Sequence, residues 1–150
     1  MPISQETAEI IRRKKAQYCR FADTCQWQHF ENIMLPTLTF EALDLDGSIL
    51  TLNGVKYRWE SREAWTAHFS EAFKVIQTIH LTDAGDLEQV AEDEVKAVFG
   101  LIYHSGTRGS ETGLHSTGAG HYHETWRRVD GDWFMKSCSM KRLYSKVMQI

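Results

Sequence analysis

The stretch GHYHETWRRVDGDWF, residues 120–134, holds two strand-like runs on either side of Asp130-Gly131. An Asp-Gly pair between two such runs is typical of the tight turn that joins antiparallel strands. We therefore predict a β-hairpin at this point, with its second strand extending to residue 145. Upstream, β-branched and aromatic residues predict further strands at residues 75–81, 86–93 and 94–105.

Between these strands lies GTRGSETGLHSTGAG, residues 106–120, which is rich in glycine and small polar residues. We predict a flexible connection or a lid over a pocket. The stretch is not a phosphate-binding loop, because it lacks the Gly-Lys-Ser/Thr ending and the strand-to-helix context.

Helical patterns occupy the first half of the chain. Apolar residues between Ala8 and Ala22 repeat on one stripe, and Ser4 is a suitable N-cap, so we predict a helix over 5–22 with Asp23 at or just past its end. A short helix is expected at 27–35, and Ser61 precedes a clear helix at 62–73. Between these helices, residues 37–45 alternate like a strand, and Asp46-Gly47 and Asn53-Gly54 are turn signals.

Helices followed by a run of antiparallel strands indicate an α+β fold. The 150 residues, without a linker-like segment, favour one domain over 1–150. We expect a cone-shaped, curved antiparallel sheet, an α+β barrel closed by the N-terminal helices, with a cavity on its concave side.

Charge and composition restrict the classes of function. The formal net charge of −3 argues against a nucleic-acid partner, and RRKK at 12–15 is predicted to be a solvated helix face. Lys15 interrupts the apolar stripe, and we expect its stem to lie along the protein with its amine in water. No signal peptide and no membrane-spanning run is found, and the three cysteines lack zinc or disulfide spacing. These features predict a cytoplasmic protein without a membrane partner.

Three residues have both a structural and a chemical interpretation. Asp23 follows an apolar helix and is either a solvated helix-end residue or a buried acid facing a cavity. His80 lies inside an apolar strand, where a neutral imidazole is a core residue or a proton carrier. His104, near the end of another apolar strand, has the same two interpretations.

Three stretches resemble the scytalone dehydratase and SnoaL-like family, which has the nuclear transport factor 2-like fold. They are ADTCQWQHFENIMLPTLTF at 22–40, TIHL at 78–81 followed by EDEVKAVFGLIYH at 92–104, and the hairpin at 120–134. Relatives in this group use a buried Asp–His dyad without a cofactor. The resemblance implies that Asp23 and His80 are that dyad and that His104 is a second catalytic histidine.

The same resemblance implies an acid–base enzyme acting on a hydrophobic small molecule, such as a polycyclic or polyketide-like compound of secondary metabolism. A base of this kind removes a proton next to a carbonyl, which begins a dehydration, an isomerisation or a cyclisation. The carboxylate fixes the tautomer of the imidazole and stabilises its charged form. Relatives form homodimers or homotrimers through the convex face of the sheet, and we expect the same here.

The residues expected to contact the substrate differ from those of the dehydratases. Their two water-holding tyrosines fall on Ala22 and Ala42, and a later asparagine falls near Tyr122. A serine on the same strand of the dehydratases falls near Gly120. An arginine on the last strand of the similar hexachlorocyclohexane dehydrochlorinase falls near Cys138. A substrate other than scytalone is therefore expected. The candidate substrate-binding residues are Trp27, Phe40, Trp65, Phe69, Tyr103, Tyr122 and Glu124.

Two alternatives stay open at this point. The first is a non-catalytic binding module, in which Asp23 and His80 do not meet or the cavity is filled by side chains. The second is a metal enzyme using His115, His121 and His123. If Tyr122 points into the cavity, the alternation of a strand sends Glu124 the same way and both His121 and His123 outward. Glu124 is then an auxiliary acid or a partner of Arg127 or Arg128.

Overall fold

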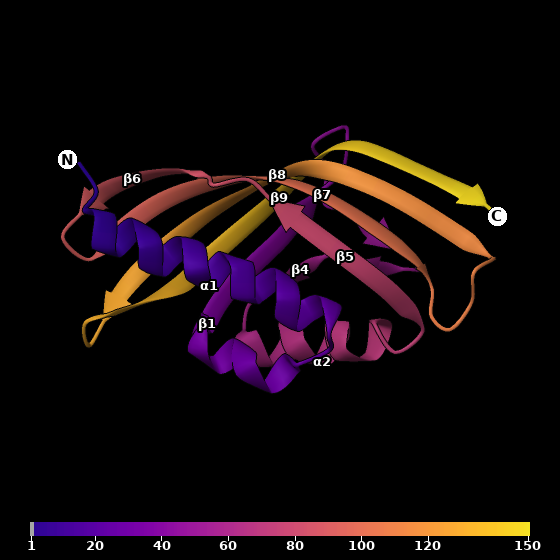
Figure 1. Cartoon of the computed structure of the whole chain (residues 1–150), viewed down its shortest axis with the longest axis horizontal. Helices are drawn as coiled ribbons and strands as arrows, with labels where there is room; N and C mark the ends of the chain where they lie inside the picture. Colours follow the sequence, from indigo (N-terminus) through magenta and orange to yellow (C-terminus); the bar gives the residue numbers. More distant parts are fainter. Residues whose placement is uncertain (1) are drawn as a thin grey trace.

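A computed structural model describes residues 2–150 and shows two α-helices packed beneath one curved sheet (Figure 1). The helical segments are α1 (Gln5–Asp23), the 3₁₀ helix η1 (Trp27–Asn32) and α2 (Arg62–Ala72). The strands are β1 (Met34–Leu43), β2 (Thr51–Leu52), β3 (Val55–Lys56), β4 (Arg58–Trp59), β5 (Ile76–Thr82), β6 (Asp86–Ala91), β7 (Glu94–Thr107), β8 (Leu114–Val129) and β9 (Asp132–Gln149).

Side-chain caps begin both helices as the sequence predicts. The Ser4 hydroxyl accepts a hydrogen bond from the Thr7 backbone N–H, and the Ser61 hydroxyl accepts one from Ala64. Each cap satisfies a backbone donor that the first turn of a helix leaves free. The predicted helix at 27–35 is shorter than expected and is a 3₁₀ turn.

The main sheet has the order β4-β1-β9-β8-β7-β5, and β6 also pairs with β7. The α+β prediction with a curved sheet is confirmed, but two details are corrected. The sheet is not closed into a barrel, since its path ends at β4 and β5. Nor is it wholly antiparallel, because β1 runs parallel to β9.

The predicted loop at 106–120 is too long, because β8 already begins at Leu114. Two of the glycines that suggested a loop, Gly118 and Gly120, serve close packing within the sheet. A Cβ at Gly118 would lie 2.1 Å from the ring of Tyr103, and one at Gly120 would lie 2.0 Å from the backbone oxygen of Lys141. Glycine is therefore required where two chain segments approach this closely.

The basic run at 12–15 is not a solvated face throughout. Lys14 is largely buried and Lys15 is completely buried, whereas the prediction placed the amine of Lys15 in water. The reason is that α1 lies across the concave side of the sheet, so the stripe that carries Lys15 is fully covered (Figure 1). Within residues 2–150, no helix is both long and apolar enough to cross a membrane.

Candidate functional site

A cavity of about 270 Å³ lies between the helices and the concave face of the sheet. Six of the candidate substrate-binding residues line it: Trp27, Phe40, Trp65, Phe69, Tyr103 and Tyr122. Ala22 and Ala42 also line it, so the two positions where dehydratases carry tyrosines present only methyl groups. The cavity wall is thus mainly aromatic and aliphatic, as in typical small-molecule pockets.

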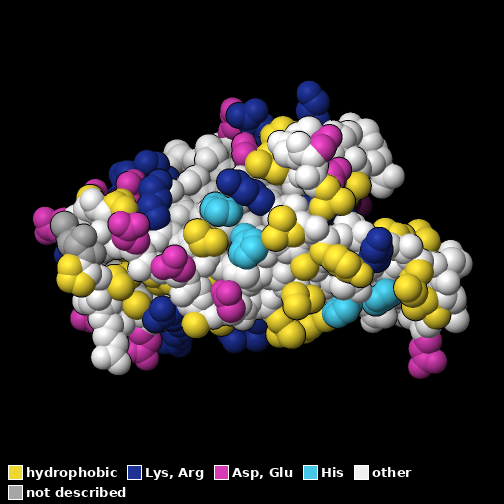
Figure 2. All heavy atoms as spheres, turned by 90° about the horizontal axis from the view of Figure 1, so that it is seen from above, with side chains coloured by type: hydrophobic (Ala, Val, Ile, Leu, Met, Phe, Trp, Pro, Cys, Tyr) yellow, Lys and Arg dark blue, Asp and Glu magenta, His cyan; other side chains and the backbone are white. Residues whose placement is uncertain are grey.

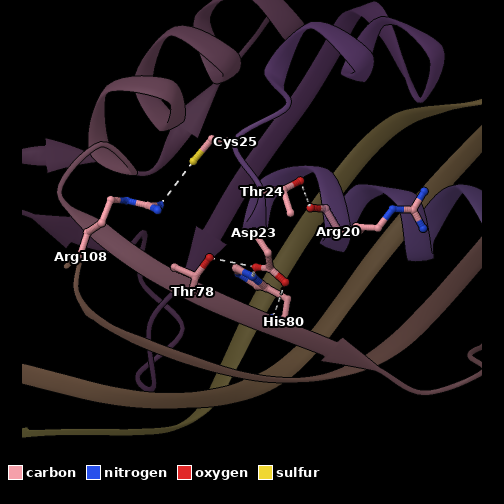
Figure 3. A network of polar contacts seen from close by, with 7 residues as sticks. All are labelled: Arg20, Asp23, Thr24, Cys25, Thr78, His80 and Arg108. Carbon is pink, nitrogen blue, oxygen red and sulfur yellow. Dashed lines mark hydrogen bonds and ion pairs between the residues drawn. The ribbon is translucent and has the colours of Figure 1, made fainter. Parts of the chain in front are cut away.

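Asp23, the last residue of α1, meets His80 of β5 at the edge of this cavity (Figure 3). The Nδ1 atom of His80 lies 2.6 Å from Oδ1 of Asp23. The backbone N–H of His80 donates to Oδ2 at 3.0 Å, and the Thr78 hydroxyl donates to Oδ1 at 2.9 Å. Because an ionised carboxylate only accepts hydrogen bonds, Nδ1 carries the proton in the neutral imidazole.

The ring of His80 is held between two aromatic rings. Tyr103 stacks on it with centroids 5.6 Å apart, and Phe73 is nearly parallel at 6.4 Å. The side chain of His80 is 14% exposed and lines the cavity. With Nδ1 engaged by Asp23, Nε2 is the ring nitrogen left to accept a proton from a bound molecule.

His104 does not join this site, and the prediction that it acts beside His80 is corrected. His80 pairs with Tyr103, so His104, one residue further on β7, faces the opposite side of the sheet. There it is exposed, its Nδ1 lies 2.8 Å from the Thr117 hydroxyl, and its ring stacks on His115. Figure 2 shows this outer face, where histidine side chains lie among apolar ones.

Glu124 shares the inward face of β8 with Tyr122, as expected from strand alternation, but it does not line the cavity. It is fully buried beneath α1, where its Oε2 lies 2.5 Å from Nζ of Lys15 and its Oε1 accepts from the indole N–H of Trp126. Burial raises the pKa of Glu124, and the adjacent Lys15 opposes that rise. The predicted partners Arg127 and Arg128 and the contact with substrate are therefore wrong.

Two tyrosines separate this ion pair from the cavity. Nζ of Lys15 lies 3.8 Å from the ring centroid of Tyr18 and 3.4 Å from that of Tyr122, and both tyrosines line the cavity. Burial raises the pKa of both phenols well above the usual range, so both remain protonated at neutral pH. The two hydroxyl groups are hydrogen-bonded to each other, so one hydroxyl proton is left to donate to a bound molecule.

Arg142 on β9 also lines the cavity, although no sequence pattern pointed to it. One terminal nitrogen lies 3.4 Å from a carboxylate oxygen of Asp44, and the other donates to the Ser145 hydroxyl. Its Nε is buried and has no hydrogen-bond partner among residues 2–150. In the sequence, Arg142 is one of several basic residues on a strand that turns polar, so alternation alone does not single it out.

Histidines 121 and 123 lie on the outer face of β8, on the side away from Tyr122. In the part of the chain that the structure describes, residues 2–150, no group of three or more His, Cys, Asp or Glu is placed to hold a metal ion. The expected ligand set of His115, His121 and His123 is thus not assembled there.

Comparison with known proteins places this site in a family. A family model for the SnoaL-like domain matches residues 4–139. A probable cyclase of Gibberella zeae is 49% identical over 150 residues and covers 100% of both chains.

Solved structures show the same fold at low identity. A scytalone dehydratase-like protein of Novosphingobium aromaticivorans is 14% identical, with a TM-score of 0.76 over 95% of this chain and 87% of its own. A hexachlorocyclohexane dehydrochlorinase of Novosphingobium barchaimii is 13% identical, with a TM-score of 0.70 over 96% of this chain and 89% of its own. The match to the family model over most of the chain and the close curated relative show that this protein belongs to the SnoaL-like domain family.

Proposed function

We propose that the protein is a cofactor-independent acid–base enzyme in which His80 removes a proton from a carbon next to a carbonyl group. The observation that carries this proposal is the 2.6 Å contact between Asp23 and His80 at an apolar cavity that His80 lines. The binding-module alternative predicted that these residues do not meet or that the cavity is filled by side chains. The contact and the open cavity count against that alternative.

The chemistry balances with these groups alone. Nε2 of His80 takes the proton, the electron pair of the C–H bond moves to the carbonyl oxygen, and an enolate forms. Asp23 stabilises the imidazolium that results. In a cyclisation, the enolate carbon attacks a second carbonyl of the same molecule and the imidazolium returns the proton to the new alkoxide. In an isomerisation the imidazolium returns the proton to another carbon of the substrate. In a dehydration the imidazolium protonates the departing hydroxide.

Among these outcomes, the relative from Gibberella zeae, which is named a probable cyclase, favours cyclisation. We propose a polyketide-like substrate for this protein. The apolar lining and the alanines at 22 and 42 support a hydrophobic, ring-containing molecule. The mass of the product separates the reactions, because dehydration removes one water whereas isomerisation and simple ring closure leave the mass unchanged.

Proton removal can be tested without the natural substrate. We expect the protein to accelerate exchange of the α-protons of 2-tetralone in deuterium oxide, followed by proton NMR. His80→Ala should lower that rate by about 10²- to 10⁴-fold, the usual contribution of a general base. His104→Ala is the matched control, since it removes an exposed imidazole outside the cavity, and it should keep the wild-type rate. Equal rates in the wild type and in His80→Ala would exclude His80 as the base.

A further inference from the structure

We infer that Arg142 is a specificity-determining residue that binds an anionic oxygen of the substrate, remote from the carbon on which His80 acts. This inference rests on the proposed function in one respect, that the cavity is the substrate site. It adds a chemical class to that proposal: an amphiphilic acid, with an apolar ring system and a carboxylate or an equally acidic enol.

A bulge in β9 brings the side chain of Arg142 into the cavity. Ala119 of β8 pairs with Tyr144, but Gly120 pairs with Arg142, so Leu143 is an extra residue in β9. Such a bulge changes which side chains face inward. In a regular strand Arg142 and Ser145, three residues apart, would face opposite sides of the sheet. Here both line the cavity and are hydrogen-bonded to each other.

The guanidinium of Arg142 is mostly buried and only partly paired. The side chain of Arg142 is only 12% exposed, and its Nε has no partner among residues 2–150. Its contact with Asp44 is 3.4 Å, longer than a good charge-assisted hydrogen bond, and Asp44 is 41% exposed. A guanidinium carries five N–H donors, so this one has donors left for a ligand. A buried cation in an apolar wall is best compensated by an anionic partner.

Arg142 lies across the concave face of the sheet from the base His80. His80, Tyr103, Gly118 and Ser145 are consecutive partners across β5, β7, β8 and β9. The ring of Tyr103 stacks on His80 and lies directly over Gly118, whose missing side chain leaves the room. A line of polar groups therefore crosses the concave face from the dyad to Ser145 and Arg142. Three strand spacings span about 14 Å, so one ring-containing molecule can reach both ends.

Binding to simple acids tests the inference directly. The probes are 2-naphthoate with its neutral counterpart 2-acetylnaphthalene, and ionised 2-hydroxy-1,4-naphthoquinone with its neutral 2-methyl ether. Dissociation constants come from isothermal titration calorimetry at neutral pH. We expect the wild type to bind at least one anion more tightly than its neutral counterpart. Arg142→Met should raise the dissociation constant of that anion by about 10- to 100-fold, as for the loss of a hydrogen bond to a charged group. Binding of the neutral counterpart should not change.

The control variant removes an arginine charge at a position outside the cavity. Arg58 on β4 is exposed and does not line the cavity, so Arg58→Met should keep the preference for the anion. Arg142→Lys should retain part of the anion preference that Arg142→Met loses. That result would show that a cation is needed at this position and that the fold tolerates the substitution. If Arg142→Met reduces the anion preference more in the naphthoate pair, the acidic group of the substrate is a carboxylate. If it reduces the preference more in the naphthoquinone pair, the acidic group is an enol.

Failure of this inference and failure of the proposed function are distinguishable. His80→Ala should still bind the anion with the wild-type preference, because binding at Arg142 does not need the base. Equal affinity of both anions and their neutral counterparts in the wild type, or equal losses in Arg142→Met and Arg58→Met, would overturn the role of Arg142. Neither result would bear on proton exchange by His80.

Discussion

Asp23 receives its hydrogen bonds from two residues that share one face of β5. Thr78 and the side chain of His80 contact Oδ1, and the backbone N–H of His80 contacts Oδ2. Each carboxylate oxygen therefore has its own donors. The backbone N–H can only donate, so it requires an acceptor at the Oδ2 position whatever residue stands at 23.

This constraint gives a sharp prediction for Asp23→Asn. The amide oxygen must take the Oδ2 position, which puts the NH₂ group at Oδ1, facing Nδ1 of His80. Nδ1 must then accept, the proton moves to Nε2, and the ring can no longer act as a base toward the cavity. We expect exchange of 2-tetralone to fall by at least about 10²-fold with unchanged near-ultraviolet circular dichroism.

Thr78→Val is the matched control for this variant. It removes one hydrogen bond from Oδ1 but leaves the carboxylate and the tautomer of His80 in place, so a loss of only about two- to tenfold is expected. Equal losses in Asp23→Asn and Thr78→Val would contradict the tautomer argument.

At the scale of elements, α2 supplies Trp65 and Phe69 to the cavity wall, and His68 on the same helix packs against a cluster of rings. His68 of α2 lies with its ring 4.7 Å from that of Trp59 and 5.2 Å from that of Tyr57. Its Nε2 is buried without a hydrogen-bond partner among residues 2–150. Burial therefore lowers the pKa of His68 from its ordinary value of 6.5.

A lowered histidine pKa has a definite consequence for stability. Below pH 6.5 the unfolded chain binds a proton at His68 before the folded protein does, so the free energy of unfolding decreases as the pH falls through this range. We expect His68→Gln to lose less stability than the wild type between pH 7.5 and 5.5, measured by urea denaturation. His29→Gln, which leaves His68 in place, should keep the wild-type difference, and the same pH dependence in His68→Gln and the wild type would refute the role of this ring.

At the scale of the whole molecule, the Lys15–Glu124 ion pair connects α1 to β8 through the centre of the core. Removing one member of a buried pair leaves the other without compensation and typically costs about 3–5 kcal/mol. Both side chains are almost fully buried, so water cannot replace the missing partner.

Lys15→Met should therefore destabilise the protein in a pH-dependent manner. Burial already raises the pKa of Glu124, and Lys15 opposes this, so the variant removes the opposing charge. As the pH rises above 4.5, the unfolded chain releases the proton of Glu124 while the folded variant retains it, so stability falls with increasing pH. We expect a larger loss at pH 8 than at pH 5 in urea denaturation.

The double variant Lys15→Met with Glu124→Leu separates the charge from the packing. Replacing both members by apolar residues of similar size is commonly neutral or stabilising, so much of the lost stability should return at pH 8. The return is reduced by the cost of leaving the buried indole N–H of Trp126 without its acceptor. A double variant as unstable as Lys15→Met, with the same pH dependence, would show that the charge of Glu124 is not the cause.

Much of the fold was predictable from local patterns. Ser4 and Ser61 mark the helix starts, and the turns at Asp130-Gly131 and Asn53-Gly54 use the left-handed backbone that these residues tolerate. The resemblance to the SnoaL-like family brought Asp23 and His80 together across 57 positions, which periodicity alone does not do. The homodimer or homotrimer expected from that resemblance stays a prediction.

The errors share a cause. His104 was assigned from the family resemblance, and Lys15 and Glu124 from their neighbours in the chain. In each case a distant element determines the surroundings of the residue. β5 and β7 pair so that Tyr103, not His104, shares the face of His80, and α1 covers the part of β8 where Glu124 would otherwise reach the cavity. Arg142 was missed because the bulge at Leu143 is a property of the pairing between β8 and β9.

The order of residues by itself determined where helices begin, where chains turn and which face of each strand is apolar, since these depend on contacts a few positions apart. The tertiary structure alone decided the register between strands, the curvature that leaves a cavity, and which charges are enclosed by α1. Those features depend on elements separated by up to about a hundred residues, such as Lys15 and Glu124, whose interaction exists only after the helix has packed on the sheet.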